Sequence, residues 1–590
     1  MMTHDEDSRE SFRSFCFQQP ISIAESILEL AACRILLRGH RMSLHPQEPP
    51  AVPEETKRIA RAAFPKGSLC LHIADELGSI YTDSQFTALF PRRGQHAEAP
   101  GRLALVTVLQ FVEGLSDRQA ADAVRGRIDW KYALGLSLID PGFDHTVLSE
   151  FRSRLIEGGA ERLLLDTLLQ RLRDRGLVKA RGRQRTDSTH VLAAVRGLSR
   201  LERVGETMRA ALNELAIIAP DWLQALAPPV WYERYNCRVE NYRLPKADKE
   251  RLELAATFGA DGDQLLVAID LAVERPWLAQ LPAIHVLREV WKAQYIKQDG
   301  QLRWRTVQEM PATAEQISSP YDPEARYGKK RDLSWTGYKA HLTETCDPET
   351  PHVITNVETT PATTPDDHML AVVHQSLAKS ALLPSEHLAD KGYTGCRMLV
   401  DSQQRHGVVI VGPVVEDTSW QAQAAEGFAK ANFHVDWDQQ VVTCPEGKQS
   451  ISWLPSTYPQ GGMQFEARFA RNDCAACPMR GRCTRSKVEP RIITLQAREE
   501  FEALRLARRN QATEEFRKSY AARAGIEGTH AQAIRRCDLR RCRYIGLAKT
   551  HLQHVITAVA INLLRIADWH NDTHSANTRI SRFAALQTVA

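Results

Sequence analysis

The spacing of apolar residues divides the chain into helical and strand-rich stretches. From residue 68 to about 178, apolar side chains recur at helical intervals, as in the run from Leu103 to Val112, and Ser116 is placed to cap the next helix. This pattern predicts a compact helical domain over residues 68–178. Short helices of this kind can carry a helix-turn-helix, so we expect this domain to bind DNA.

Strand patterns begin after Arg185. Residues 186–195 are typical of a short strand leading into a helix, and residues 338–345 and 352–359 predict two further strands. A helix is expected over residues 365–382, followed by a strand end near residue 390 and a buried strand at residues 408–412. This alternation predicts a mixed α/β sheet with flanking helices.

Two long stretches interrupt the sheet pattern. Residues 198–322 are mainly helical, whereas residues 414–494 combine turn residues, short strand patterns and clustered cysteines. Because strand and helix patterns resume after each stretch, we interpret both as insertions in one sheet domain. The core is then expected to consist of residues 179–197, 323–413 and 495–570.

The longest apolar stretch near the N-terminus does not have the pattern of a membrane or secretion signal. The apolar stretch from Ile21 to Leu37 is interrupted by three charged residues, which excludes a membrane span and the apolar region of a signal peptide. We therefore expect a cytoplasmic protein with no membrane partner. Residues 1–67 are expected to be a flexible leader, with Met42 as a candidate alternative start, and residues 571–590 a flexible tail.

Composition places the chain among ordinary globular proteins. Of its 590 residues, 43% are hydrophobic and 25% are charged, and the net charge of +4 identifies no partner. The length is enough for two to four structural units. Basic residues gather in two stretches, residues 171–185 and 517–550, which could neutralise DNA phosphates. A solvated helix face is the alternative explanation for each stretch.

Cysteines cluster in the second insertion. Cytoplasmic thiols stay reduced, so clustered ones are better explained as metal ligands than as disulfides. One CxxC pair and two further thiols fit a four-coordinate structural zinc ion in a small module without a large core. Four free cysteines are the alternative. The four residues are Cys444, Cys474, Cys477 and Cys483.

Three acids occupy positions suited to two-metal phosphodiester chemistry, which needs carboxylates from separate elements. Asp187 lies among small polar residues that leave room for a metal ion, and Asp390 precedes a glycine-containing turn at an expected strand end. Glu527 shares a helix face with Tyr520 and Arg523. A helix cap, a turn former and a surface ion pair are the structural alternatives for the three acids.

In order and spacing, these motifs resemble those of insertion-sequence transposases with the Tyr-Arg-Glu-Lys signature. The resemblance covers most of the chain from about Met42, and it implies a DNA transposase with a ribonuclease H-like core. It also implies that Mg²⁺ or Mn²⁺ is bound by a catalytic triad of Asp187, Asp390 and Glu527. The motifs that carry the resemblance are Thr186-Asp187-Ser-Thr, Leu388-Ala-Asp390-Lys-Gly-Tyr and Tyr520-x2-Arg523-x3-Glu527.

The resemblance further implies double-stranded DNA as the partner, both as the element's terminal repeats and as the target. A homodimer is expected in the synaptic complex, and Tyr520 and Arg523 are expected near the DNA. One position departs from the family pattern, because the lysine expected seven residues after the glutamate falls at Ile534. Basic side chains that could make such phosphate contacts are Arg535, Arg536, Arg540, Arg541 and Arg543.

Three other functions remain compatible with parts of this pattern. A transposase-derived protein could bind DNA without cutting it, although the complete acid set argues against this. A structure-selective nuclease on the same fold would cleave without joining strands. In a zinc-dependent regulator, the cysteine module would bind DNA or protein and the acids would be incidental. The sequence contains no P-loop, zinc-protease or serine-hydrolase motif.

Overall fold

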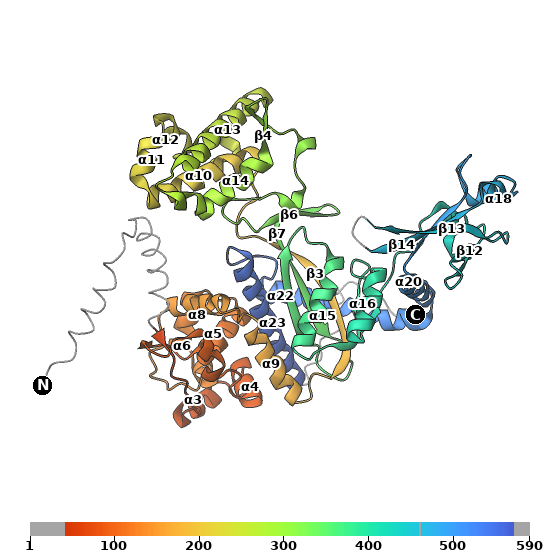
Figure 1. Cartoon of the computed structure of the whole chain (residues 1–590). Helices are drawn as coiled ribbons and strands as arrows, with labels where there is room; N and C mark the ends of the chain where they lie inside the picture. The colour runs from red at the N-terminus through yellow and green to blue at the C-terminus, as the bar shows by residue number, and fades with distance from the viewer. Residues whose placement is uncertain (1–41, 459–461, 572–590) are drawn as a thin grey trace, which may run out of the picture.

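The structure, a computed structural model, describes residues 42–458 and 462–571. At its centre lies a mixed sheet with the strand order β10–β9–β3–β7–β6, in which β8 also pairs with β7 (Figure 1). The strands are β3 (Arg181–Leu192), β6 (Arg326–Lys330), β7 (Leu333–Thr345), β8 (Ile354–Pro361), β9 (Pro384–Ala389) and β10 (Val409–Val411).

Strands β3, β7 and β8 form an antiparallel meander, and β9 and β10 extend the sheet parallel to β3. Helix α15 (Met369–Lys379) connects β8 to β9, and α16 (Cys396–His406) connects β9 to β10. Two C-terminal helices pack on the sheet, α22 (Gly525–Cys537) against β3 and α23 (Leu547–His570) against β8. The mixed α/β sheet predicted from the sequence is confirmed.

The first core strand is longer than its sequence pattern predicts. Residues 188–192 continue β3 and pair with residues 337–341 of β7, where a helix was expected to begin. The next helix, α10 (Arg200–Ile218), begins after Ser199, whose side chain accepts a hydrogen bond from the Glu202 amide. Pairing with a strand 150 residues away in sequence outweighs the local helical tendency, and no local pattern reveals that partner.

The N-terminal domain is helical, as predicted, and shares one hydrophobic core with the sheet. Helix α23 forms the link, because it packs against α5 and α9 of this domain and also against β8. The helices are α3 (Glu54–Ala63), α4 (Leu69–Leu77), α5 (Pro100–Glu113), α6 (Asp117–Gly126), α7 (Ile128–Ala133), α8 (Thr146–Glu157) and α9 (Leu163–Asp174).

The structure differs from the expected flexible leader at α3. This amphipathic helix buries Ala60 against Leu71 and Tyr132, so it belongs to the folded domain. A buried apolar face explains why these residues are ordered despite the prolines before them. The rest of the expected leader up to residue 41, and the expected tail from residue 572, lie outside the described residues.

The first insertion forms a separate lobe, drawn above the sheet in Figure 1. Its own hydrophobic core contains Phe258, Trp291 and Tyr295, which explains how it can interrupt the sheet domain without disturbing it. Its elements are α10, α11 (Pro220–Leu226), α12 (Pro229–Tyr235), α13 (Asp248–Leu271), α14 (Pro282–Gln294), β4 (Tyr295–Gln298) and β5 (Gln301–Trp304).

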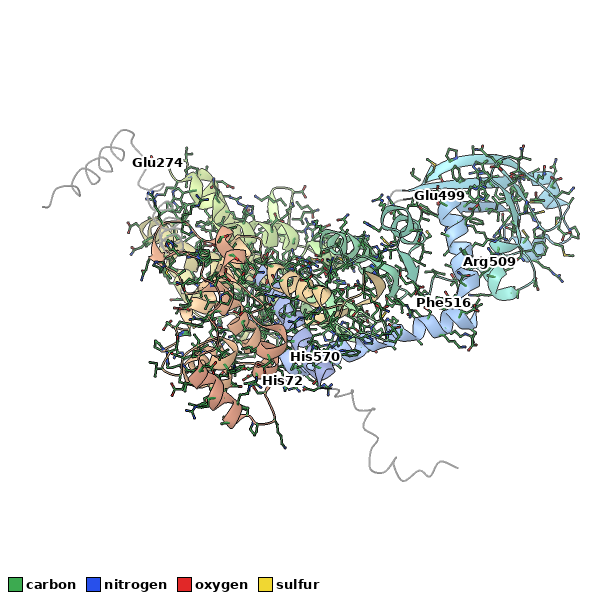
Figure 2. All side chains as sticks on the ribbon, turned by 90° about the horizontal axis from the view of Figure 1, so that it is seen from below. His72, Glu274, Glu499, Arg509, Phe516 and His570 are labelled. Carbon is green, nitrogen blue, oxygen red and sulfur yellow. The ribbon has the colours of Figure 1, made fainter. Side chains whose placement is uncertain are left out.

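The second insertion is a small β module with the core residues Phe433, Val442 and Phe469. Figure 2 shows α20 (Arg498–Gln511), which carries the labelled Glu499 and Arg509, leading from this module to α21 (Glu514–Ala521), which carries Phe516. The module contains β11 (His434–Asp436), β12 (Val441–Thr443), β13 (Ser450–Thr457), β14 (Met463–Phe469), β15 (Ile492–Gln496), α18 (Arg471–Ala475) and α19 (Arg480–Cys483). In the described part of the chain, no helix combines the length and the apolar character needed to cross a membrane.

Candidate active site

Two neighbouring parallel strands place the first two predicted acids side by side. Thr186 of β3 lies opposite Ala389 of β9, so Asp187 and Asp390, the next residue on each chain segment, lie at the same level. Asp390 follows the carboxyl end of β9, where functional groups of α/β proteins gather, whereas Asp187 lies within β3. Asp187 is buried, with 6% of its surface exposed, whereas Asp390 is half-buried at the start of a turn.

Arg523 connects all three predicted acids. Its Nη2 donates to Asp187 Oδ2 over 2.6 Å and lies 3.8 Å from Asp390 Oδ2. Its Nη1 donates to Glu527 Oε1 over 3.0 Å. The side chain of Glu527 is 63% exposed, against 9% for that of Asp187, so the site opens to solvent on the Glu527 side. The fold thus brings together the three acids and the arginine that the sequence singled out.

Electrostatics of the site are dominated by the burial of Asp187. Burial raises the pKa of Asp187 to about 6, and the neighbouring carboxylates of Asp390 and Glu527 add to this effect. The charge of Arg523 and a hydrogen bond from the Ser188 amide, 2.7 Å from Oδ1, lower the same pKa. The three carboxylates lie close enough to repel one another. The guanidinium of Arg523, which contacts all three, compensates this repulsion.

A buried polar chain holds the two acidic strands in register. The hydroxyl of Thr186, next to Asp187, lies 2.6 Å from His387 Nε2 on β9. His387 Nδ1 lies 2.9 Å from His374 Nε2 on α15, and His374 Nδ1 lies 3.2 Å from the Ser402 hydroxyl on α16. These fully buried groups satisfy one another, so the network fixes strand and helix positions beneath the acids.

Glu344 anchors the helix that carries Glu527. This fully buried carboxylate on β7 is 2.6 Å from Arg185 Nη2 and 2.6 Å from Arg565 Nη1, and it accepts a hydrogen bond of 2.6 Å from Thr529 on α22. The two arginines hold the pKa of Glu344 below its usual range despite burial. Arg185 also donates to the carbonyl of Ala522, just before α22. The ion pairs thus fix α22 against the sheet.

His530 lies beside the acids, although it is not among the residues selected from the sequence. It lies three residues after Glu527 on α22, and one ring nitrogen, one Asp187 oxygen and one Glu527 oxygen all lie within 4.8 Å of one another. Burial lowers the pKa of His530 to about 4, so the imidazole is neutral at physiological pH. The Glu-x-x-His spacing was a signal that could have identified it, because residues three apart share a helix face.

Asp366 lies at the border of the site rather than acting only as a helix cap. It accepts hydrogen bonds from Ser188 Oγ at 3.2 Å and from Lys339 Nζ at 2.9 Å. Because Lys339 neutralises it at close range, Asp366 is less suited to binding a metal ion than Asp390, whose Oδ2 lies 3.8 Å from Arg523 Nη2. Tyr393, in the turn after Asp390, is buried beside these acids and its hydroxyl lies 2.9 Å from His341 Nδ1.

The aromatic ring predicted near the DNA lies beside the acids. Tyr520 stacks on Phe516 of α21, with ring centroids 5.5 Å apart and an interplanar angle of 10°. Its pKa is raised by burial and by the carboxylates of Asp390 and Asp187, which shows that the ring is close to them. The half-buried pair forms an aromatic edge next to the acidic site.

The candidate phosphate-binding arginines occupy different environments. Arg535 and Arg536 are exposed and line a cavity of about 1040 Å³, which Arg565 and Trp569 also line. Arg540 is exposed and donates to Thr189 Oγ1 over 3.2 Å. Arg543, by contrast, lies 4.4 Å from the centroid of the Phe111 ring and donates to the carbonyl of Leu115. Arg541 is exposed, and its backbone pairs with Leu192 at the end of β3.

The four cysteines of the second insertion line one cavity of about 360 Å³. The segment after Cys444 forms a tight turn in which the Lys448 amide donates to Cys444 Sγ over 3.3 Å. Burial raises the pKa of Cys483 to about 11, and the other three thiols contribute in the same direction. Within the described residues these sulfurs do not form a group as tight as the 4.8 Å cluster at Asp187, so a shared metal ion would have to draw them together.

On a mixed sheet, Asp187 and Glu527 belong to a group of side chains that could hold a metal ion, as in enzymes that bind divalent metal through carboxylates. Residues 59–154 match the family described as transposase domain (DUF772), and residues 443–567 match the transposase DDE domain, which implies a ribonuclease H-like core. Together the two matches support an insertion-sequence DDE transposase, in agreement with the resemblance drawn from the motifs. No curated protein matches the chain.

One matched segment lies near the start of the described chain and the other near its end. The first contains most of the N-terminal helical domain, and the second contains the cysteines, α22 with Glu527 and most of α23. Asp187 and Asp390 lie outside both segments. Their assignment to the site therefore depends on the motif order in the sequence and on the geometry of β3 and β9.

Proposed function

We propose that this transposase binds the ends of its insertion element and catalyses metal-dependent DNA strand cleavage and strand transfer. The observation that carries the proposal is the convergence of Asp187, Asp390 and Glu527 on Arg523, from two strands and a helix. Carboxylates from separate elements at one solvent-accessible point are what two-metal phosphodiester chemistry needs. The partners in this proposal are the terminal repeats and the target, both double-stranded DNA.

The donor set fits Mg²⁺ or Mn²⁺. Asp187 and Asp390 lie at one level of the sheet, and Glu527 lies close to Asp187 from α22, so these three carboxylates would hold the divalent metal. Such ions lower the pKa of a bound water and stabilise charge on the leaving oxygen. The first step releases a 3′-hydroxyl at the element's end, and that hydroxyl then attacks a target phosphodiester.

Arg523 has two roles in this proposal. Without metal its guanidinium neutralises the carboxylates, and with metal and DNA in place it is free to bind a backbone phosphate in the bidentate manner of arginine. Tyr520 then provides an apolar face beside the sugar-phosphate backbone. The exposed Arg535, Arg536 and Arg540 extend a basic surface along and beyond α22 that can neutralise further phosphates.

Two further parts of the proposal concern assembly and location. Joining two element ends requires two active sites, so we propose a homodimer in the synaptic complex. The helical N-terminal domain is proposed to read the terminal repeat, because it is packed rigidly on the catalytic sheet through α23. DNA as substrate places the protein in the cytoplasm, on the nucleoid when bound.

The test is cleavage of a labelled duplex carrying the element's own ends, with Mg²⁺ or Mn²⁺. Asp187→Asn, Asp390→Asn and Glu527→Gln keep the side-chain shapes and should each lower cleavage by at least a hundredfold while leaving DNA binding intact. Asp299→Asn, in the hairpin turn of the first insertion, is the matched control and should cut like the wild type.

Other outcomes of this experiment identify the competing functions. If the acid variants cut as well as the wild type, the triad assignment is wrong. Binding without cleavage by the wild type supports a transposase-derived DNA-binding protein. Cleavage of branched or mismatched duplexes without strand joining supports a structure-selective nuclease. Each result concerns a different step, so a single set of gels separates them.

We also propose that Cys444, Cys474, Cys477 and Cys483 bind a structural zinc ion. The supporting observations are their shared cavity and the amide of Lys448 donating to Cys444 Sγ, a bond that stabilises a thiolate. A β module with so few core residues gains stability from a metal ion. The four thiols are all free, so no disulfide competes for them.

Zinc content of the purified full-length protein tests this second proposal. One zinc ion per chain is expected by elemental analysis, with loss in Cys474→Ser and Cys477→Ser. Cys237→Ser, an exposed cysteine of the first insertion, is the control. Equal zinc in all variants, or none in the wild type, would overturn the assignment. If zinc removal abolished DNA binding while the acid variants still cut, the zinc-dependent regulator would become the better explanation.

A further inference from the structure

The position of His530 on α22 gives the acidic site a fourth ligand of different chemistry. His530 is three positions after Glu527, so their side chains project from one face of the helix. That face is pressed against β3, where Asp187 lies. One potential ligand atom of each of these three residues lies within 4.8 Å of the others, and each comes from a group that binds divalent metal.

His530 is also buried without a partner. Only 5% of its surface is exposed, and its Nε2 is fully enclosed with no hydrogen-bond partner among the described residues. Leaving such a nitrogen unsatisfied costs about 1–3 kcal/mol. The other histidines beneath the site are paired, since His341, His374 and His387 all make hydrogen bonds with neighbouring side chains. An unpaired buried imidazole next to two carboxylates therefore calls for a ligand.

We infer that His530 supplies a nitrogen ligand to the metal ion held by Asp187 and Glu527, which makes this side of the site a carboxylate–imidazole site. The inference rests on the proposed function, because it concerns the same metal ion. The Nε2 of His530 makes no hydrogen bond among the described residues, so its lone pair is not already engaged. A Glu-x-x-His pair on one helix is a ligand arrangement that other metal-binding helices use.

A nitrogen ligand has a consequence for metal selectivity. Mg²⁺ prefers oxygen ligands and retains several waters, whereas imidazole suits transition metals. The site is therefore expected to bind Mn²⁺ more tightly than Mg²⁺, with His530 responsible for part of the difference. His530→Gln should weaken Mn²⁺ binding at least tenfold and change Mg²⁺ binding by less than threefold.

The decisive measurement is pulsed electron paramagnetic resonance of Mn²⁺ bound to the full-length, zinc-replete protein. A directly coordinated imidazole gives a ¹⁴N modulation of the Mn²⁺ echo, and labelling histidine with ¹⁵N changes its frequency. The wild type should show this histidine signal, and His530→Gln and His530→Ala should lose it. His285→Gln, an exposed histidine of the first insertion, should keep it.

The outcomes separate this inference from the proposed function. If Mn²⁺ binds in a way that depends on Asp187 but shows no histidine coupling, the ligand role of His530 is wrong and the triad stands. If no Mn²⁺ binds even to the wild type with DNA present, the metal site as a whole fails. Thermal melting of each variant checks folding, and a folded His530→Gln protein that retains the nitrogen signal also overturns the inference.

Discussion

Arg523 and Asp187 form the closest ion pair of the active site, 2.6 Å from Nη2 to Oδ2, across 336 positions of sequence. The pair joins the first core strand to the segment just before α22. In the metal-free protein it places a cation among three carboxylates. A metal ion bound as proposed would compete with this ion pair for the same oxygen atoms, and that competition can be measured.

Replacing Arg523 should increase the stabilisation that metal provides. In Arg523→Ala the carboxylates of Asp187, Asp390 and Glu527 repel one another without compensation, so the metal-free melting temperature should fall. Saturating Mg²⁺ should then raise the melting temperature by more than it does in the wild type. Scanning fluorimetry with and without Mg²⁺ measures both effects, and Arg93→Ala, an exposed arginine of the N-terminal domain, is the control. If Mg²⁺ raised the melting temperature of Arg523→Ala and of the wild type by the same amount, Arg523 would not compete with the metal ion.

Removing the charge of Glu344 should destabilise the core strongly. Glu344→Gln leaves Arg185 and Arg565 without their buried partner, and breaking a buried pair in this way costs about 3–5 kcal/mol. Chemical denaturation monitored by circular dichroism gives the value. Glu349→Gln, at the exposed pair with Lys179, should have little effect. A similar midpoint for both variants would show that Glu344 does not anchor α22.

Two glycines on α22 provide a matched test of close packing. A Cβ at Gly525 would overlap the guanidinium of Arg185, whereas a Cβ at Gly528 would meet no atom within 4 Å. Gly528→Ala should therefore stabilise the protein by up to about 1 kcal/mol through helix propensity. Gly525→Ala should destabilise it and reduce cleavage, because α22 would have to move away from β3. Denaturation midpoints of the two variants should shift in opposite directions.

Stability should fall as the pH decreases from about 6.5. Burial lowers the pKa of His554 to about 3, whereas the unfolded chain takes up a proton near pH 6.5. Below pH 6.5 the unfolded state therefore binds more protons, and each such histidine removes about 1.4 kcal/mol of stability per pH unit until its folded pKa is reached. His554→Gln should flatten the decline between pH 6.5 and 4, and His285→Gln should not. Unfolding at several pH values compares the slopes.

The arginines near the C-terminal end of α22 should differ in their effects on DNA binding. Arg536 is exposed beside the basic cavity, so Arg536→Ala should lower affinity and reduce the salt dependence of binding by about one phosphate contact. Arg543 instead packs on Phe111, so Arg543→Ala should lower the melting temperature. Binding isotherms at several salt concentrations, together with melting curves, distinguish the two roles. If Arg543→Ala reduced the salt dependence of DNA binding and left the melting temperature unchanged, Arg543 would be a DNA contact and not a packing residue.

Sequence patterns identified most helices and strands of the core, but they did not identify the long-range contacts between them. Periodicity placed the helical domain, both insertions and most strands, and the motif order selected Asp187, Asp390 and Glu527 before any geometry was known. The full extent of β3 was missed, because it depends on pairing with β7. Glu344 was missed for the same reason, since nothing in its local sequence reveals Arg185 and Arg565 on either side.

His530 shows a different limit of sequence reasoning. It lies three residues after Glu527, but the motif in this segment is defined by a tyrosine, an arginine and a glutamate and does not include the histidine. What singles it out is the combination of burial, an unpaired nitrogen and nearby carboxylates, and all three are properties of the folded chain. Arg543 is the opposite case. Its charge suggested a contact with DNA phosphate, whereas in the structure its side chain packs on the ring of Phe111.

Separation of the acids along the chain also affects when the protein can act during its synthesis. Asp187 leaves the ribosome early, but Glu527, Arg523 and the buried helix α23 that closes the core are made near the end. An incomplete nascent chain thus contains the aspartates without their glutamate or their covering helix. Under the proposed function, a prematurely terminated product would lack the third acid and could not cut the chromosome, so nicking would first arise when translation is almost finished.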